Sequence, residues 1–372
     1  MGEEKPYTPR NILVTGGAGF IGSHVVVRLV QRYPQYRVVV FDCLDYCATL
    51  HNLQAVKDAP NFKFIKGDIK SGDLLYYVME TEKIDTVMHF AAQTHVDHSF
   101  GNSVSFTINN MYGTHVLLEA ARRYGQVHRF INVSTDEVYG ETSFGLAAGL
   151  VEKSRLEPTN PYAAAKARRR GRRLLRHAGA EIMALAYYTS YQLPVIITRG
   201  NNVYGPGQFP EKLIPKFILL AASDRPLTVY GAGEAVRSYL YIADVAAAYD
   251  AVLHCGLVGE VYNIGSVRER SVLEVAHDIG AAFGRQAPLL EHVRDRAFND
   301  RRYFINNDKL AALGWEESTS WEQGLRKTID WYLNLPSPAE YWDNGNLDAA
   351  LQPHAGLNRQ RRVVPLEGQN GF

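Results

Sequence analysis

The sequence predicts a doubly wound α/β fold, in which helices cover both faces of a parallel sheet, with a smaller α/β lobe towards the C-terminus. Three short apolar runs rich in β-branched residues, 11–15, 37–41 and 129–133, have the length of buried strands. Stretches with apolar residues at helical spacing lie between them. Strands that alternate with helices in this way build a parallel sheet.

The first strand leads into a glycine-rich turn. Residues 11–15 are followed by three glycines, and residues 24–30 then have the apolar spacing of an amphipathic helix. Such glycines let the backbone approach a pyrophosphate, which the free amides of the helix N-terminus stabilise. The pattern predicts a Rossmann-type dinucleotide site. Its binding turn comprises Gly16, Gly19, Phe20, Ile21 and Gly22.

The second strand, 37–41, ends in Asp42, twenty residues beyond Gly22. An acid at this place accepts hydrogen bonds from the adenosine ribose hydroxyls and repels a 2′-phosphate. The predicted cofactor is therefore NAD rather than NADP.

Two further strands end at the same edge of the sheet. Residues 62–65 lead to Asp68, which would flank the adenine, although a strand followed by a simple turn explains this acid equally well. Residues 86–90 lead to two alanines, which permit close approach of a cofactor. The predicted cofactor contacts from this region are Asp68, Ile69, Ala91, Ala92 and Asn110, the last at the start of a helix over 110–124.

Residues 94–98 carry two histidines around Asp97. Such a set suggests metal ligands, but no third group of ligands follows nearby, and Cys43 and Cys47 also lack the His/Cys partners that a zinc site requires. We therefore predict no metal. Thr94 and Asp97 are assigned to substrate contacts, with loop packing as the alternative.

The strand over 129–133 delivers two adjacent carboxylates, Asp136 and Glu137, to the carboxyl edge of the sheet. Open α/β sheets keep their ligands at that edge. Taken alone, an acid pair after a strand is more often a helix N-terminal pair favoured by the dipole. Combined with a cofactor fingerprint, it predicts an acid/base pair.

Tyr162 and Lys166 are four residues apart in a predicted helix, so their side chains share one face. An ammonium beside a phenol lowers the cost of the phenolate, which makes the tyrosine a general base towards a sugar hydroxyl. This spacing alone is common by chance. Together with Asp136 and Glu137 it predicts two proton-transfer systems, and hence two coupled reactions.

The remaining chain is expected to form an interleaved second lobe. Residues 140–158 are predicted to be a loop over the site, 193–198 a strand, and 199–207 a turn out of the sheet. The expected domains are 9–207, which binds the cofactor and carries the catalytic residues, 208–354, which binds the substrate, and a disordered tail over 355–372. Arg237 and Arg296 are candidates for a diphosphate, although each taken singly is more often a surface residue.

Composition points to a soluble cytosolic protein. The formal net charge of +1 gives no reason to expect nucleic acid or an anionic membrane as a partner. Three cysteines are few and odd in number, as in a reducing compartment. The N-terminus lacks the apolar core of a signal peptide, and no apolar run reaches membrane-spanning length. We expect a cytoplasmic protein.

Residues 9–354 resemble the extended short-chain dehydrogenase/reductases, and within them the nucleotide-sugar 4,6-dehydratases. The resemblance rests on residues 135–137, where epimerases carry small residues, and on 199–206 and 210–215. Residues 295–303 resemble the UDP-glucose 4,6-dehydratase domain of plant-type UDP-rhamnose synthases. Bacterial dTDP-glucose enzymes usually have Gly-His in place of Phe298-Asn299.

The resemblance implies conversion of UDP-glucose to UDP-4-keto-6-deoxy-glucose, the first step of UDP-rhamnose formation, with NAD recycled internally. Because the second domain of the plant enzymes is missing, we expect the reaction to stop there. The nearest alternative is dTDP-glucose as substrate. An alternative of another class is an inactive NAD-binding regulator or scaffold.

The resemblance also implies residue roles. Tyr162, assisted by Lys166, takes the proton from the sugar O4, to which Thr135 donates a hydrogen bond. Glu137 removes the C5 proton, and Asp136 protonates the departing C6 hydroxyl. The implied substrate contacts are Thr94, Asp97, Asn201, Lys212, Leu213, Arg237, Arg296 and Asn299.

One segment departs from the family pattern. Residues 168–178, with six arginines and one histidine, separate Lys166-Ala167 from a Gly-Ala-Glu segment at 179–181. As a continuous helix, the eleven residues would add about 16 Å at 1.5 Å per residue; a basic loop is the alternative. Because the family's Tyr-Lys helix packs in a dimer interface, the expected homodimer is sensitive to this insertion. A basic docking patch, a tolerated loop and a gene-model error stay open.

Overall fold

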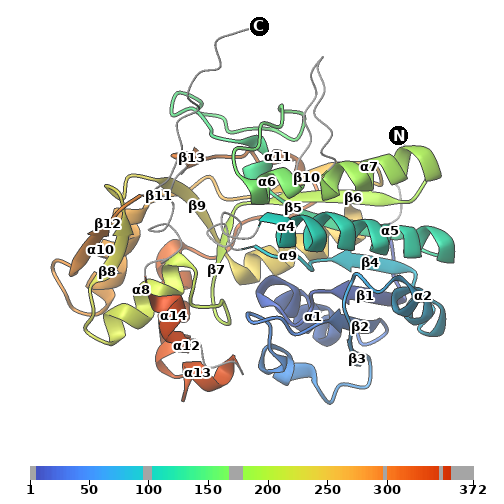
Figure 1. The fold of residues 1–372 in the computed structure, drawn as a ribbon, viewed down its shortest axis with the longest axis horizontal. Coiled ribbons are helices and arrows are strands. Elements are labelled where there is room, and N and C mark those ends of the chain that lie inside the picture. Colours follow the sequence, from blue (N-terminus) through green and yellow to red (C-terminus); the bar gives the residue numbers. More distant parts are fainter. Residues whose placement is uncertain (1–5, 95–102, 167–178, 296–299, 343–346, 353–372) are drawn as a thin grey trace, which may run out of the picture.

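In the computed structural model, the described residues are 6–94, 103–166, 179–295, 300–342 and 347–352. A parallel sheet of seven strands forms the main layer, in the order β10-β6-β5-β4-β1-β2-β3 (Figure 1). The predicted doubly wound α/β fold is therefore confirmed. The strands are β1 (Asn11–Thr15), β2 (Arg37–Asp42), β3 (Phe62–Lys66), β4 (Thr86–His89), β5 (Arg129–Thr135), β6 (Val195–Gly200) and β10 (Val261–Ile264).

The order of the strands reverses beside β1. The chain runs outward from β1 through β2 to β3, and then returns to place β4 on the other side of β1. Both pairings with β1 are parallel. A crevice forms at the carboxyl ends of such a strand pair, and ligands of open α/β sheets bind there.

Helices cover both faces of the main sheet. One face carries α1 (Phe20–Arg32) and α9 (Ile242–Cys255), which lie side by side. The other face carries α2 (Gly72–Thr81), α5 (Gly113–Tyr124) and α7 (Ala180–Tyr191). Side chains alternate along β1, so Ile12 and Val14 join the first core and Leu13 the second. Burial on both faces explains why these strands read as continuous apolar runs.

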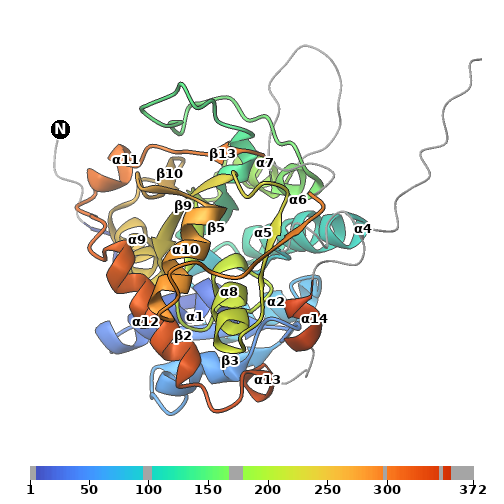
Figure 2. The same ribbon diagram turned by 90° about the vertical axis from the view of Figure 1, so that its left-hand side faces the viewer.

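A second set of elements packs beside the sheet, at the left of Figure 1 and facing the viewer in Figure 2. It contains two small sheets, β11-β9-β13 with β7 paired to β9, and β12-β8. The strands are β7 (Asn202–Tyr204), β8 (Leu227–Tyr230), β9 (Val236–Tyr241), β11 (Glu269–Ser271), β12 (Leu290–Val293) and β13 (Arg302–Tyr303). The helices are α8 (Leu213–Ala222), α10 (Val272–Ala282), α12 (Trp321–Leu333), α13 (Pro338–Tyr341) and α14 (Leu347–Leu351). Helix α11 (Asp308–Ala311) packs instead against β10 and α9 of the main layer.

The chain crosses between the two parts more than once. After residue 208 it supplies α8 and β8 to the second part, returns α9 and β10 to the main layer, and leaves again. A division of the chain at residue 207 remains a prediction, with β10 lying beyond it. The predicted tail over 355–372 lies outside the described residues.

Several predicted boundaries were wrong by a few residues. The first helix begins at Phe20 rather than 24, because Gly22 and Ser23 fit within its buried first turns. The helix expected over 110–124 is a π-helical turn, η2 (Thr107–Tyr112), followed by α5, which begins at Gly113. Turns of this kind occur frequently at functional sites.

The turn expected over 199–207 contains the short strand β7, which pairs with β9. The loop prediction for 140–158 is confirmed, since these residues form neither a helix nor a regular strand and make an isolated bridge from Leu150 to Ile305. Within the described ranges, no helix is long and apolar enough to cross a membrane.

Candidate active site

The glycine turn after β1 is closely packed against the end of β4. Gly16 has φ +71°, and a Cβ there would lie 2.5 Å from the backbone nitrogen of Ala91. A Cβ on Gly22 would lie 2.3 Å from the carbonyl oxygen of Gly16. At Gly19 the nearest contact would be 3.3 Å, again to Gly16 O. The backbone thus forms a cradle at the crevice, and its shape fits a dinucleotide pyrophosphate.

Asp42 closes the cradle on the side of β2. Its carboxylate is buried and accepts hydrogen bonds from the backbone nitrogens of Ala18 at 3.0 Å and Leu44 at 2.8 Å. Burial raises the pKa of Asp42, and these two hydrogen bonds oppose that rise. The acid is therefore held rigidly against the glycine turn, as recognition of a ribose requires.

The other predicted cofactor residues differ in how they are engaged. Asp68 is partly exposed and closes a turn by accepting from Lys70 N at 2.9 Å, which agrees with the turn interpretation. Ile69 is buried against Gly113. The buried Asn110 side chain pairs with the backbone of Gln93, accepting from its nitrogen at 2.8 Å and donating to its oxygen at 2.9 Å. Asn110 therefore orders the segment that follows Ala91 and Ala92.

Thr135 and Asp136 stand where β5 passes into the short 3-10 helix η3 (Asp136–Tyr139). The Thr135 hydroxyl caps that helix by accepting from Glu137 N at 3.4 Å, and it donates to Asp136 Oδ1 at 3.2 Å. Asn201 Nδ2 donates to the other oxygen of Asp136, Oδ2, at 2.6 Å. Burial and the adjacent Glu137 charge raise the pKa of Asp136 to about 7.

Glu137 retains some surface exposure and accepts a hydrogen bond from Asn160 Nδ2 to its Oε2 at 2.9 Å. Burial raises the pKa of Glu137, whereas the Asn160 hydrogen bond and the charges of Arg237 and Lys212 lower it. Donors and cations thus oppose the effect of burial at Glu137, and a charge on Glu137 favours a protonated Asp136.

Tyr162 and Lys166 lie on one helix, α6 (Pro161–Lys166), as predicted. Burial raises the pKa of Tyr162 well above its ordinary value, the charges of Glu137 and Asp136 raise it further, and a hydrogen bond with the Thr135 side chain opposes the rise. The Lys166 ammonium donates to the backbone oxygen of Val133 at 3.1 Å. Direct support of a Tyr162 phenolate by this ammonium remains a prediction.

A buried ion pair behind Lys166 was not predicted. Glu181 is fully buried in the first turn of α7 and pairs with Arg199 through Nη2 at 2.5 Å and Nε at 3.2 Å. Burial lowers the pKa of Lys166 to about 8, and the charge of Glu181 opposes that shift. The Gly-Ala-Glu segment therefore lies beside the site, as the family pattern expects. The arginine-rich residues 168–178 lie outside the described residues.

The predicted substrate residues converge from the second part of the chain. Lys212 Nζ donates to the backbone oxygen of Thr94 at 2.9 Å, and Leu213 begins α8 directly after it. Arg237 donates to Asp300 O at 2.6 Å and lies over the Tyr303 ring at 4.5 Å. The predicted contacts Asp97, Arg296 and Asn299 lie outside the described residues.

Arg237 also faces the acid pair. Its charge lowers the pKa of both Asp136 and Glu137. The sequence pointed to a diphosphate because guanidinium groups match phosphate oxygens, and it carried no signal for proximity to the carboxylates. That proximity arises because β9 and β13 bring Arg237 and Asp300 together.

Asn160, Asp300 and Tyr303 are further site residues that sequence reasoning missed. Asn160 precedes Pro161-Tyr162, and an Asn before a Pro is a recognisable helix start. Asp300 and Tyr303 carried no comparable local signal. Among the described residues, no three His, Cys, Asp or Glu side chains gather in a group suited to a metal ion.

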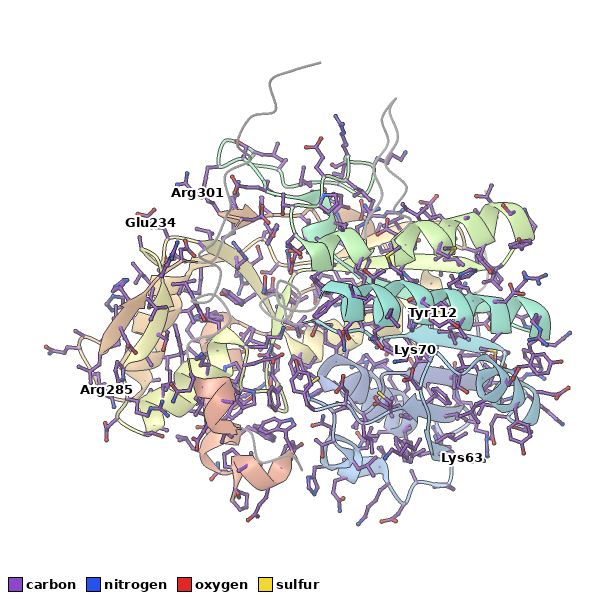
Figure 3. The ribbon with its side chains drawn as sticks, in the orientation of Figure 1. Lys63, Lys70, Tyr112, Glu234, Arg285 and Arg301 are labelled. Atoms are coloured by element: carbon purple, nitrogen blue, oxygen red, sulfur yellow. The ribbon has the colours of Figure 1, made fainter. Side chains whose placement is uncertain are left out.

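Charges far from the site are paired locally. Lys63 and Arg285 lie at opposite ends of the molecule (Figure 3) and pair with Glu82 and Asp224 respectively.

Tyr112, on the broad face that carries α5, is 54% exposed (Figure 3). Val104 and Ile108, two turns and one turn before it, are 68% and 46% exposed. These three residues form an exposed apolar stripe.

Comparison with known proteins identifies the family of the chain. The family model for GDP-mannose 4,6-dehydratase matches residues 13–328. The chain belongs to this family. The resemblance to extended short-chain dehydrogenase/reductases of the 4,6-dehydratase type is thereby confirmed.

Curated relatives include an Arabidopsis thaliana protein named as a trifunctional UDP-glucose 4,6-dehydratase, UDP-4-keto-6-deoxy-D-glucose 3,5-epimerase and UDP-4-keto-L-rhamnose reductase. It is 58% identical over 94% of the chain, and the chain spans 50% of its length. The dTDP-D-glucose 4,6-dehydratase of Mus musculus is 45% identical over 92% of the chain and 93% of that protein.

Solved structures of dTDP-glucose 4,6-dehydratases are close neighbours of this dehydratase-family chain. The enzyme from Streptomyces venezuelae, solved with NAD bound, has a TM-score of 0.80 at 38% identity, covering 87% of this chain and 97% of that chain. The enzyme from Bacillus anthracis, also in complex with NAD, has a TM-score of 0.78 at 41% identity and covers 87% and 96%.

Proposed function

We propose that this chain is an NAD-dependent nucleotide-sugar 4,6-dehydratase acting on UDP-glucose. The observation that carries the activity is one buried cluster in which the acid pair Asp136-Glu137 adjoins Tyr162. An alcohol oxidation alone needs the tyrosine, whereas an elimination of water also needs an acid and a base. The cluster supplies both systems.

The two carboxyl groups take different roles because their surroundings differ. Asn160, Arg237 and Lys212 favour the ionised form of Glu137, which suits a base that removes the proton from C5. Burial and the charge of Glu137 favour a proton on Asp136, which suits an acid that protonates the departing C6 hydroxyl. We assign the acid and base roles on this difference in the partners of the two carboxyls.

Tyr162 serves the first proton transfer, from the sugar O4. Lys166 is buried close behind β5 and next to Glu181, so its ammonium is held in place when the phenol loses its proton. The Thr135 hydroxyl hydrogen-bonds both Tyr162 and Asp136. This short chain of hydroxyls offers a route by which the proton taken up at Tyr162 replaces the one that Asp136 gives to the leaving water.

The glycine cradle and Asp42 would hold NAD, with Asp68, Ile69, Ala91, Ala92 and Asn110 on the same edge. Bound there, NAD would supply hydride chemistry, with the hydrogen from C4 held and then given back at C6, so that no external reductant would be needed. Glu137 returns the proton to C5. The sum of these steps is the loss of one water from the sugar.

UDP-glucose is proposed as the substrate because the relatives named for UDP-glucose are 57–58% identical, against 42–45% for those named for dTDP-glucose. The dTDP sugar is the second candidate, since its dehydratases match the chain over nearly their whole length. With either sugar the product is the 4-keto-6-deoxy sugar. A UDP product would belong to rhamnose formation.

The test is to incubate the purified chain with UDP-glucose and, in parallel, with dTDP-glucose, without added reductant. Mass spectrometry should detect loss of one water from the UDP sugar at the higher kcat/KM. A higher kcat/KM for dTDP-glucose would reverse the substrate assignment. Retained NAD without product from either sugar would favour the regulator or scaffold instead.

A homodimer and a cytoplasmic location complete the proposal. The exposed apolar stripe of Val104, Ile108 and Tyr112 supports self-association, because an exposed apolar patch is a candidate surface for a protein contact. Sedimentation at increasing concentration tests the dimer, and a Tyr112→Glu variant should shift it towards monomer.

A further inference from the structure

Asn160 joins the two proton-transfer systems of the site. Its side chain is buried, at 7% exposure, just before α6. The amide oxygen accepts from the backbone nitrogen of Ala163 at 2.8 Å, and thereby caps the helix that carries Tyr162. The amide nitrogen donates to Glu137 Oε2 at 2.9 Å.

The orientation of this amide is determined by its partners. A backbone N–H only donates, so it must meet the amide oxygen, and a carboxylate only accepts, so it must meet the NH2 group. In the flipped amide, the NH2 group would face the backbone N–H of Ala163, donor against donor. The amide oxygen would face the Glu137 carboxylate, acceptor against acceptor. Both ends of Asn160 are therefore committed at once, one to each catalytic element.

The segment that carries Asn160 is itself anchored. Thr159 Oγ1 donates to Asp300 Oδ2 at 2.5 Å, and Tyr303 donates to the same oxygen. Asp300 is 2% exposed, and its backbone oxygen accepts from Arg237 at 2.6 Å. Asn160 is thus fixed from the second part of the chain as well as by α6.

We propose that Asn160 is a positioning residue that fixes the Glu137 carboxylate relative to Tyr162 through the two ends of its amide. The inference rests on the proposed function, in which Glu137 is the base for the C5 proton. With Oε2 held, the carboxylate does not rotate away from the sugar. A displacement of about 1 Å in such a base lowers the rate about 10²-fold.

The groups that face Glu137 come from several elements. They are Asp136 on η3, Tyr162 on α6, Arg237 on β9, Tyr303 on β13, and Lys212 and Asp300 on the connecting segments. Among the described residues, the side chain of Asn160 donates a hydrogen bond to the Glu137 carboxylate. Loss of that donor should therefore raise the pKa of Glu137 as well as free the carboxylate.

The test uses Asn160→Ser, which retains a side chain that caps helices well and removes the donor to Glu137. We expect oxidation at C4 to continue and elimination to fall about 10²-fold, so that reduced cofactor accumulates during turnover. Exchange of the C5 hydrogen with deuterated solvent should fall equally. Elimination and C5 exchange at the wild-type rates would overturn the proposal.

Asn160→Asp provides a second variant that also retains the cap. It places a carboxylate against Glu137, so elimination should fall further than in Asn160→Ser, and recovery of activity should require higher pH. Wild-type elimination in this variant would equally refute the role. Ser271→Ala, which removes the capping box of the remote helix α10, is the control for loss of a cap and should leave the partition between oxidation and elimination unchanged.

A readout without turnover separates this inference from the proposed function. Glu137 can be titrated by its ¹³C-carboxyl resonance, assigned by its absence in Glu137→Gln. We expect the titration to move up by about one unit in Asn160→Ser, the equivalent of one charged hydrogen bond. An unchanged titration would overturn the inference. A shifted titration in a protein that dehydrates neither sugar would refute the proposed function and leave the contact established.

Discussion

The hydrogen bond from Asn201 to Asp136 should set the pH at which the acid of the site stops working. Asp136 has a pKa of about 7, and its Oδ2 accepts from Asn201 Nδ2 at 2.6 Å. A donor to a carboxylate stabilises the ionised form, so removing it raises the pKa. Asn201→Leu retains the size of the side chain and removes the donor.

The magnitude follows from the strength of that contact. A hydrogen bond to a charged group contributes about 1.5–3 kcal/mol, and one pKa unit corresponds to about 1.4 kcal/mol, so the pKa of Asp136 should rise by about one to two units. In the proposed mechanism Asp136 acts in its protonated form, so activity should be lost as pH rises through its pKa. The variant should therefore stay active to higher pH, until deprotonation of Lys166, whose pKa is about 8, becomes limiting.

The assay is the pH dependence of kcat/KM for dehydration, which reports groups of the free enzyme. The alkaline limb should move from about pH 7 in the wild type to about pH 8 in Asn201→Leu. Because Asp136 and Glu137 interact, the limb belongs to the pair rather than to one carboxyl. The variant also leaves Ser266 N without its acceptor, so a loss of stability of about 1–3 kcal/mol should accompany the shift.

Asn307→Leu is the matched control. Asn307 donates to the backbone oxygen of Gly265 at 2.8 Å, and this hydrogen bond does not involve either carboxyl of the acid pair. Loss of the Asn307 donor should therefore leave the alkaline limb in place. If the limb of Asn201→Leu stays near pH 7, or moves to lower pH, the assignment of Asp136 as the protonated acid is wrong.

Three further expectations concern the cofactor-binding part of the main sheet, around β1, β2 and β4. Burial lowers the pKa of His89 to about 3 in the folded chain, whereas His89 in the unfolded chain takes up a proton near pH 6.5. Because protonation then favours the unfolded chain, stability should fall as pH decreases below 6.5. Between pH 7 and 5 the wild type should lose about 2 kcal/mol more than His89→Gln in denaturant unfolding, and equal losses would contradict the burial argument. Asp42→Asn should reduce the ratio of NAD affinity to NADP affinity, measured by calorimetry, at least about tenfold. The variant loses the charged hydrogen bond to the ribose of NAD and the repulsion of the 2′-phosphate of NADP. An unchanged affinity ratio would argue that Asp42 does not discriminate between the two cofactors. Gly22→Ala puts a Cβ 2.3 Å from Gly16 O, so it should destabilise the fold by about 1–3 kcal/mol and release NAD. The control Gly145→Ala, in a more open loop, should have neither effect. Wild-type stability in Gly22→Ala would show that the cradle relaxes.

The local patterns of the chain were sufficient for the cofactor half. The three glycines and Asp42 are close in sequence, and a strand, a tight turn and a helix are decided by neighbouring residues. The acid pair and the Tyr162–Lys166 helix were predictable for the same reason. Errors arose at boundaries, such as the π-helical turn before α5, where tertiary packing overrides local preference.

The contacts between distant segments were beyond the reach of sequence patterns. Asn201 and Asp136 are separated by 65 positions, and Thr159 and Asp300 by 141. Nothing in the residues around Asp300 indicates that its carboxylate anchors the segment before α6. Such pairs form because the chain returns from the second part to the main sheet, which no local pattern encodes.

The sequence by itself determined the fold class and the glycine turn, and it placed the acid pair and the Tyr162–Lys166 pair on local elements, because each depends on residues a few positions apart. Only the tertiary structure decided how those groups are tuned. Burial and the charge of Glu137 favour a proton on Asp136, whereas Asn201 and Arg237 oppose it; Asn160 and Arg237 favour a charge on Glu137 against the effect of burial. Those energies depend on distances and burial in the folded chain, which exist only after β9, α6 and β6 have packed around β5.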